Sequence, residues 1–164
     1  RLPMGADVLA VEPARDGGVW VAGADGVRHV HDGERVETVP GVPPEPVFSL
    51  AEDVAGALWL GTADGLVRVA QGRAERLGAD RGLVGRVGAL LFDREGTLWA
   101  GTSGGGLVRL HEAAFSMRVP TGSAVVLTVH EDPRGRLWAG TDDGVLHRAD
   151  GDAGRDGGLV PAHR

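Results

Sequence analysis

Four tryptophans at nearly equal spacing constrain the fold of this chain more than any other feature. Trp20, Trp59, Trp99 and Trp138 are separated by 39, 40 and 39 residues. The same pattern surrounds each of them, with a valine twelve residues before and a glycine three residues before the tryptophan. Three copies also have an aspartate six residues before the tryptophan, where the first copy has Ala14. A register that returns four times predicts four copies of one structural unit.

Each unit has the composition of four short strands joined by tight turns. In the second unit we expect strands at VFSLAED, LWLG, LVRV and RAERLG, with a D-x-x-G turn after the first and a T-x-x-G turn after the second. No window shows an apolar 3.6-residue period long enough for a helix. Short, evenly spaced strands with one tryptophan per unit predict an all-β chain, a β-propeller with four blades of four antiparallel strands. Within one propeller segment, residues 1–164, the expected blades are residues 6–43, 44–83, 84–122 and 123–164.

The repeated tryptophans and aspartates are expected to be structural. A lone four-stranded blade cannot cover both of its faces, so blades stack and the tryptophans fill the space between neighbours. Asp53, Asp93 and Asp132 are expected to accept backbone N–H bonds within the D-x-x-G turns. The alternative, a set of metal-binding or acidic groups, is disfavoured because a propeller spreads its copies around the ring. The neighbouring acids Glu52 and Glu131 are expected to be solvated.

The composition excludes several classes of function. The chain has 17 Lys+Arg and 23 Asp+Glu, a net charge of −6 with no basic block, so we expect no nucleic-acid partner and no contact of this segment with a membrane. The chain has no cysteine, which removes disulfides, thiolate-bound zinc and thiol nucleophiles. No apolar run approaches the roughly 20 residues that span a bilayer.

The repeat resembles that of the two-component regulator propeller family. The best-matching stretch, residues 82–109, is GLVGRVGALLFDREGTLWAGTSGGGLVR. The first unit departs from the family pattern at Ala14 and at Ala22-Gly23, and the third has an extra glycine before Leu107. The resemblance implies an input propeller on the periplasmic or extracellular side of a bacterial membrane that signals to a histidine kinase. Streptogramin-lyase-like propellers share a related pattern.

The number of blades in the complete ring is left open by the sequence. Four blades lie at the lower limit for propellers. The chain is therefore expected to be a partial propeller, a closed four-blade ring, or half of an eight-blade ring made by a homodimer, with the partial propeller favoured. Residues 1–3 align with the end of a fourth strand and are expected to complete the last blade on ring closure, whereas residues 151–164 form a poor strand.

One position in the third strand is basic in every unit. It holds His29, Arg68, Arg109 and His147. We expect Arg68 and Arg109 to pair with carboxylates between blades, and the alternative is a cationic ring for an anionic ligand. His29 and His31 share one strand face because side chains alternate along a strand. Zinc needs a third ligand, and none is evident at usable spacing, so no metal site is expected.

Ligand binding is expected on the face built by the T-x-x-G turns and by the loops that lead into the first strands. Loops carry variable chemistry on a rigid frame. Their mixed charges favour a polar small molecule or a glycan. The candidate residues are Asp25, Glu45, Asp64, Arg86, Ser103, Ser123, Asp142 and Asp143.

No catalytic constellation is present, and no cofactor is expected. The serines lack a nucleophile-elbow context, and SGGGL is followed by a strand, not by the helix of a phosphate-binding loop. The sequence therefore favours a non-catalytic ligand-sensing module of a bacterial two-component protein. The alternatives are a lyase-type propeller enzyme that depends on a divalent cation and a protein-interaction platform.

Overall fold

The computed structural model describes residues 7–31, 35–79, 83–111, 114–119, 124–144, 146–149 and 160–161. The expectations for residues 1–3, for Ser123, for the side chain of His147 and for most of residues 151–164 lie outside this part. None of the described residues belongs to a helix that is long and apolar enough to cross a membrane.

Four antiparallel four-stranded sheets make up the fold, and each falls within one of the expected repeat units. The first contains β1 (Val8–Pro13), β2 (Val19–Gly23), β3 (Gly26–His31) and β4 (Arg35–Thr38). The second contains β5 (Ser49–Glu52), β6 (Leu58–Thr62), β7 (Gly65–Ala70) and β8 (Arg73–Leu77). The third contains β9 (Val87–Phe92), β10 (Leu98–Thr102), β11 (Gly106–His111) and β12 (Ala114–Val119). The fourth contains β13 (Val126–Glu131), β14 (Leu137–Thr141), β15 (Leu146–Ala149) and β16 (Val160–Pro161).

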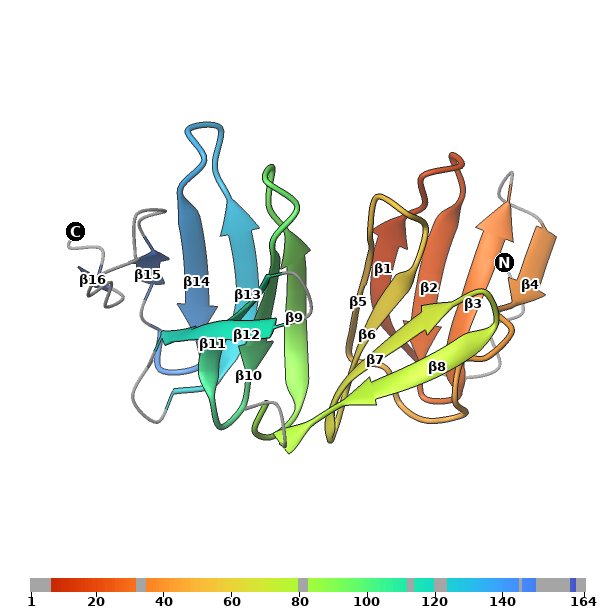
Figure 1. Cartoon of the computed structure of the whole chain (residues 1–164), viewed down its shortest axis with the longest axis horizontal. Helices are drawn as coiled ribbons and strands as arrows, with labels where there is room; N and C mark the ends of the chain where they lie inside the picture. The colour runs from red at the N-terminus through yellow and green to blue at the C-terminus, as the bar shows by residue number, and fades with distance from the viewer. Residues whose placement is uncertain are drawn as a thin grey trace.

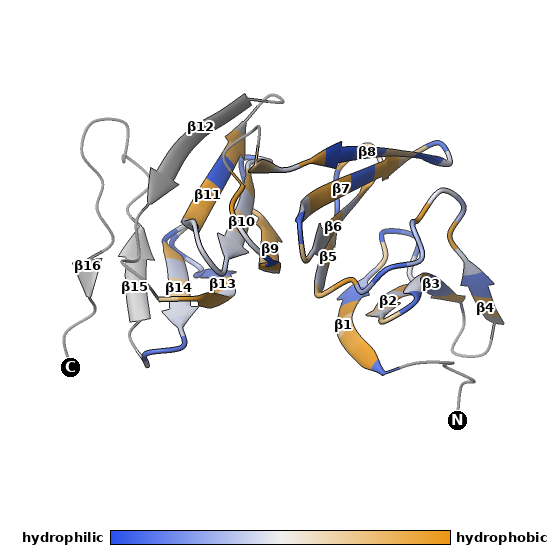
Figure 2. Cartoon of the chain, turned by 90° about the horizontal axis from the view of Figure 1, so that it is seen from below, coloured by the Kyte–Doolittle hydropathy of each residue, from blue (hydrophilic) through white to orange (hydrophobic). Residues whose placement is uncertain are grey.

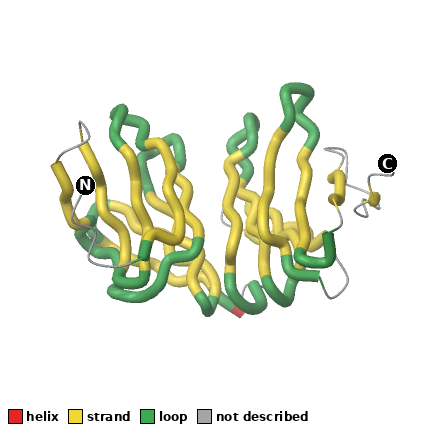
Figure 3. The backbone as a smooth tube through the Cα atoms, turned by 180° about the vertical axis from the view of Figure 1, so that it is seen from behind, coloured by secondary structure: helices red, strands yellow, loops and turns green. Residues whose placement is uncertain are grey.

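The order of the strands within each sheet is the order of the chain, which is the arrangement of a propeller blade. The first strands of consecutive blades, β1, β5, β9 and β13, contact one another along the inside of the assembly. The D-x-x-G turns lie at one edge of the blades and the T-x-x-G turns at the opposite edge (Figures 1 and 3). The expected all-β fold with four four-stranded propeller blades is confirmed.

The four blades form an open arc and not a closed ring. Figure 2 shows them side by side, with the first and the last blade at opposite ends of the arc. Because the blades pack nearly face to face, four of them turn through less than a full circle. Strand β1 accordingly stays exposed, with Val8 49% and Val11 58% accessible. Of the three expected arrangements, the closed four-blade ring is not the one observed. The arc is consistent with a partial propeller, and the eight-blade ring made by a homodimer stays a prediction.

The glycine of the W-x-G-T pattern lets neighbouring blades approach closely. A Cβ atom placed on Gly61 would overlap both Ser49 Oγ and the carbonyl oxygen of Val87 in the next blade. The equivalent Cβ on Gly101 would lie 2.5 Å from Val126 Cγ1 of the fourth blade. Glycine is therefore required at these positions by packing between blades.

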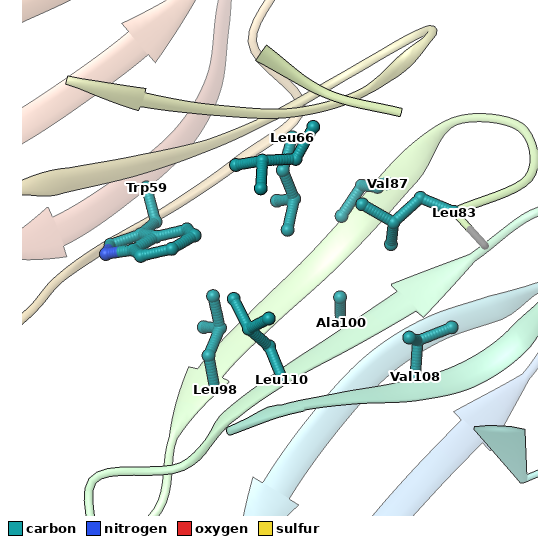
Figure 4. Packing of buried hydrophobic residues seen from close by; sticks show 9 residues of the cluster. Trp59, Leu66, Leu83, Val87, Leu98, Ala100, Val108 and Leu110 are labelled. Atoms are coloured by element: carbon teal, nitrogen blue, oxygen red, sulfur yellow. The ribbon is translucent and has the colours of Figure 1, made fainter. Parts of the chain in front are cut away.

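Trp20, Trp59 and Trp99 pack between neighbouring blades, as the repeat predicted. Between the second and third blades, Trp59 and Leu66 pack against Leu98 and Leu110 (Figure 4). Trp99 packs in the same way against residues of the fourth blade, and Trp20 packs at the edge of the cluster between the first two blades. Trp138 of the fourth blade is partly exposed, and no further blade follows it among the described residues. Apolar burial between blades thus supplies the core that a single blade lacks.

Candidate functional site

The turn aspartates have the expected structural role, and they also hold the tryptophans. Asp53 Oδ1 accepts backbone N–H bonds from Ala55 and Ala57 at 2.9 and 2.8 Å. Its other oxygen, Oδ2, accepts the indole N–H of Trp59 at 3.1 Å. The third and fourth blades repeat this arrangement around Asp93 and Asp132. One carboxylate therefore closes the turn and orients the side chain that packs on the next blade.

Asp132 shows how strongly these turns favour the ionised carboxylate. Burial opposes its ionisation, but hydrogen bonds from the Arg136 backbone, the Trp138 indole and the Arg136 side chain outweigh that effect. They hold the pKa of Asp132 well below its usual range.

The first blade lacks this aspartate and uses a carboxylate of the second blade in its place. Ala14 provides no acceptor, and the Trp20 indole N–H donates to Glu52 Oε2 at 2.8 Å. The same oxygen accepts the Arg15 backbone N–H at 3.0 Å. Glu52 is thus bonded across the blade interface, and the expectation that it is simply solvated is wrong. The Trp20 indole is available to Glu52 because the first blade has Ala14 where the other blades have the turn aspartate.

The third and fourth blades are joined in a related way. Glu131 Oε2 accepts the Arg94 backbone N–H at 3.0 Å, so Glu131 is not simply solvated either. The Arg94 guanidinium donates to the carbonyl oxygens of Asp132 and Pro133 at 3.1 and 3.0 Å. Charge-assisted bonds therefore clamp the turn edge of this interface.

Among the described residues, the interface between the second and third blades has no carboxylate bond of this kind at its D-x-x-G edge. The position of Glu52 is occupied by Phe92 in the third blade, and the position of Arg15 by Val54 in the second. Val54 is 80% exposed, and the Phe92 ring meets Trp59 edge-on at 6.4 Å between centroids. At the D-x-x-G edge of this interface, an apolar residue stands on each side. The other two interfaces fill the same space with side chains that are hydrogen-bonded across it.

A cavity of about 390 Å³ occupies this space. Trp59, Phe92, Leu98 and other apolar side chains of both blades form its walls. Asp53, Arg68 and Glu75 add charged groups to the same cavity. Its volume and its mixture of aromatic walls with a few polar groups are typical of small-molecule sites.

Arg68 is the cation of the cavity. It is paired with Trp59 across β6 and β7, so both side chains lie on the face toward the third blade. Its guanidinium lies 5.6 Å from the centre of the Trp59 ring and 3.9 Å from Asp53 Oδ2. A turn aspartate was the expected partner, but Asp53 belongs to the same blade, so the expectation of pairing between blades is wrong for Arg68. The strand register places the arginine on the same face as the tryptophan that this aspartate binds.

Arg109 occupies the equivalent position in the third blade. Its Nε atom is buried and has no hydrogen-bond partner among the described residues, and no ion pair joins it to a carboxylate there. The expected pairing of Arg109 between blades is therefore not seen in the described part of the chain.

The described residues of the expected ligand face lie on the T-x-x-G side, but several of them stabilise the loops of the fold. Ser103 Oγ accepts the Arg86 backbone N–H at 3.0 Å, and Asp142 Oδ1 accepts the Val125 backbone N–H at 2.8 Å. Asp143 Oδ1 accepts the Thr141 hydroxyl at 2.6 Å. The bonds of Ser103 and Asp142 tie the T-x-x-G turn to the segment that leads into the first strand, and the bond of Asp143 lies within the turn.

The charged residues of this face have partners as well. Asp25 forms a two-point ion pair with Arg28, with one contact at 2.8 Å, and this bond lowers the pKa of Asp25. Glu45 lies 2.8 Å from an Arg76 guanidinium nitrogen.

The remaining two residues of the expected ligand face are more open. Asp64 is exposed in the β6–β7 turn. Arg86 is also exposed, and its guanidinium lies 5.0 Å from the centre of the Phe48 ring. Of the seven expected residues that the structure describes, Asp64 and Arg86 therefore have the freest side chains, and these seven residues do not converge on one pocket.

The cavity could not be predicted from the sequence, because the residues that line it are far apart in the chain. Phe92 and Glu75 come from different blades and carry no motif. The signal that was present is the residue before the turn aspartate, which is glutamate in the second and fourth units and phenylalanine in the third. An apolar residue there marks an interface without the carboxylate clamp.

Comparison with known proteins shows which family of repeats the sequence matches. The family "Two component regulator propeller" matches residues 41–64, 82–104 and 121–143, in the second, third and fourth units. No curated protein matches the sequence. The unmatched unit is the one with the departures at Ala14 and Ala22-Gly23.

Solved structures agree in fold. Two structures of the extracellular domain of BT4673 from B. thetaiotaomicron, described once as a one component system and once as a hybrid two component system, match with TM-scores of 0.70 and 0.66 at 21% and 16% identity. They cover 88% and 96% of this chain, which spans only 21% and 29% of those chains.

Virginiamycin B lyase from Staphylococcus aureus matches with a TM-score of 0.74 at 17% identity, over 98% of this chain and 57% of the lyase. At such identities these likenesses show the propeller fold alone. The sequence match and the blade structure together lead to the family: the chain carries the repeats of the two component regulator propeller family.

Proposed function

We propose that this chain is a non-catalytic input propeller of a bacterial two-component protein, on the periplasmic or extracellular side of the membrane, and that it binds a polar small molecule between its second and third blades. The family match and the likeness to an extracellular sensor domain support the first part. The cavity at the unclamped interface carries the second.

The chemistry of the cavity defines the class of ligand. Trp59 and Phe92 offer ring faces and edges for a flat or apolar side of the ligand. Arg68 has no hydrogen bond among the described residues, and its 3.9 Å contact with Asp53 is a weak one. Its planar guanidinium is therefore free to bind a carboxylate or a pair of hydroxyl groups. Acidic sugars and aromatic carboxylates both combine these features.

The position of the cavity also suggests how binding is transmitted. A ligand that contacts Arg68 and Phe92 touches two blades at once. It favours whichever mutual orientation of the blades gives it the better contacts, because a ligand shifts a conformational equilibrium only by its difference in affinity. The other two interfaces are fixed by carboxylate bonds at the same edge, so the second and third blades are the pair that can move.

Binding to the 164-residue chain tests the proposal. Calorimetric titration with a panel of aromatic carboxylates and uronic acid oligosaccharides is expected to find a binder whose affinity falls at least tenfold in Arg68→Gln. Arg73→Gln, which changes an exposed arginine of β8 outside the cavity, is the matched control and is expected to leave affinity unchanged.

Three outcomes contradict the proposal. If no compound of the panel binds, the cavity is not a site for this class. If Arg86→Gln abolishes binding and Arg68→Gln does not, the ligand sits on the T-x-x-G face. Turnover of a bound compound that requires a divalent cation would favour a lyase-type enzyme.

A further inference from the structure

The first blade differs from the repeat in its β1–β2 turn and in strand β3. These differences bring three side chains that can bind a metal close together. We propose that Asp16, His29 and His31 form a binding site for a divalent transition metal of the zinc type. This site is separate from the cavity between the second and third blades and does not depend on the function proposed for it.

The three side chains come from two neighbouring elements. His29 and His31 alternate with Val30 on β3, so both project from the same face. Asp16 lies in the turn between β1 and β2, at the edge of the blade where β3 ends (Figure 1). No third ligand for the two histidines was evident from the spacing of residues in the sequence. The structure provides one, because β2 pairs with β3 and brings its preceding turn beside them.

The distances fit a tetrahedral centre. His29 Nε2 lies 3.2 Å from Asp16 Oδ1, and His31 Nδ1 lies 3.7 Å from Asp16 Oδ2. One ligand atom from each residue lies within 4.8 Å of the other two. Zinc bonds of about 2.0–2.2 Å in a tetrahedron place ligand atoms about 3.3–3.6 Å apart. Small side-chain rotations therefore suffice to bring the three groups onto one ion, with the fourth position left for water.

His29 supplies an independent reason to expect an ion. Its side chain is buried, with 8% of the residue accessible, and its ring stacks on Trp20 with 3.8 Å between centroids. The approach of Nε2 to Asp16 lacks hydrogen-bond alignment, so this buried nitrogen has no hydrogen-bond partner among the described residues. Buried polar atoms without a partner are rare in proteins, and the binding of an ion is one accepted reason for such an atom.

Gly18 keeps the space beside the ligands open. A Cβ atom there would lie 2.7 Å from His29 Nε2 and 3.2 Å from Asp16 Oδ1. The other three units have Ala57, Thr97 and Arg136 at this position. The first blade alone combines the small residue with the histidine and the displaced aspartate.

The carboxylate of Glu37 also lies near His31, on the side of the ring away from Asp16. Glu37 Oε2 on β4 lies 3.8 Å from His31 Nε2, the ring nitrogen that the metal does not use. A carboxylate in this position orients a metal-bound imidazole and increases its basicity. The arrangement therefore includes a second layer of support as well as three ligands.

Metal titration of the chelator-treated chain tests the site directly. With Zn²⁺ we expect one ion bound per chain and a rise in melting temperature, because an ion that binds only the folded state stabilises it. Asp16→Asn and His31→Gln are expected to weaken Zn²⁺ binding at least tenfold. His130→Gln, which changes an exposed histidine of β13, is the matched control and is expected to bind Zn²⁺ like the unchanged chain.

A spectroscopic measurement on the unchanged chain covers the case in which a variant fails to fold. Co²⁺ added to the metal-free chain is expected to give the intense visible absorption of a four-coordinate site, and Zn²⁺ is expected to displace it. Binding that Asp16→Asn and His31→Gln leave intact would overturn the proposal. So would weak binding of several ions per chain without the Co²⁺ signature.

Discussion

Glu52 is predicted to stabilise this protein more than Glu131, although both occupy the same position in the repeat. Both accept a backbone N–H from the preceding blade at 3.0 Å. Only Glu52 also holds an indole, since Trp99 of the third blade has its own acceptor in Asp93. Glu131 instead lies 3.6 Å from Nε of the exposed Arg94, and a solvent-exposed ion pair of this length contributes little to stability. The comparison of Glu52→Ala with Glu131→Ala therefore measures mainly the bond from Trp20 to Glu52.

The size of the difference follows from the bonds that each change removes. The bond between a backbone N–H and an exposed carboxylate contributes about 0.5–1.5 kcal/mol, and the part-buried indole bond to a charged acceptor about 1.5–3 kcal/mol. Glu131→Ala is expected to cost about 1 kcal/mol. Glu52→Ala is expected to cost about 3 kcal/mol, because it also leaves the Trp20 N–H without an acceptor. The gap of about 2 kcal/mol corresponds to about 4–8 °C in melting temperature for a chain of this size.

Urea unfolding followed by circular dichroism and tryptophan fluorescence measures both variants. A third variant, Ala14→Asp, restores the acceptor that the other blades have. In that background the cost of Glu52→Ala is expected to fall toward that of Glu131→Ala, which a double-mutant cycle reports as a coupling energy. Equal destabilisation by Glu52→Ala and Glu131→Ala, or a coupling energy of zero, would refute the reasoning.

Two further predictions concern packing and ionisation. Gly61→Ala is expected to destabilise the chain by more than about 2 kcal/mol, because its Cβ meets the Val87 carbonyl of the next blade. Gly88→Ala, whose nearest neighbour lies at 3.8 Å, is the control and is expected to change the free energy of unfolding little. Asp132→Asn is expected to lower the melting temperature at pH 7, because the folded chain depresses the pKa of this carboxyl. The stabilisation by Asp132 is fully present above the unfolded pKa of about 3.9 and is lost as the pH falls below it, so wild type and variant should converge toward pH 2. A difference in melting temperature that persists unchanged at pH 2 would contradict the assignment.

The interfaces between blades explain why some features of the candidate sites could be predicted and others could not. The turn at Asp53 is local, since the aspartate bonds to residues two, four and six positions ahead, and the sequence pattern was enough to expect its role in the turn. The bond from Trp20 to Glu52 spans 32 residues and exists only because two blades stack. The lining of the cavity and the approach of Asp16 to the two histidines depend in the same way on contacts between strands or blades.

The sequence by itself determined the repeat, the all-β fold, the strands of each blade and the side chains that close its turns. These follow from patterns within about ten residues, where hydrogen bonds and the alternation of side chains act locally. Only the folded structure shows that the four blades form an open arc, that one interface lacks a described carboxylate bond and has a solvent-open cavity there, and that Asp16 lies beside His29. The physical reason is that these features depend on the relative positions of groups brought together by packing, which no spacing along the chain records.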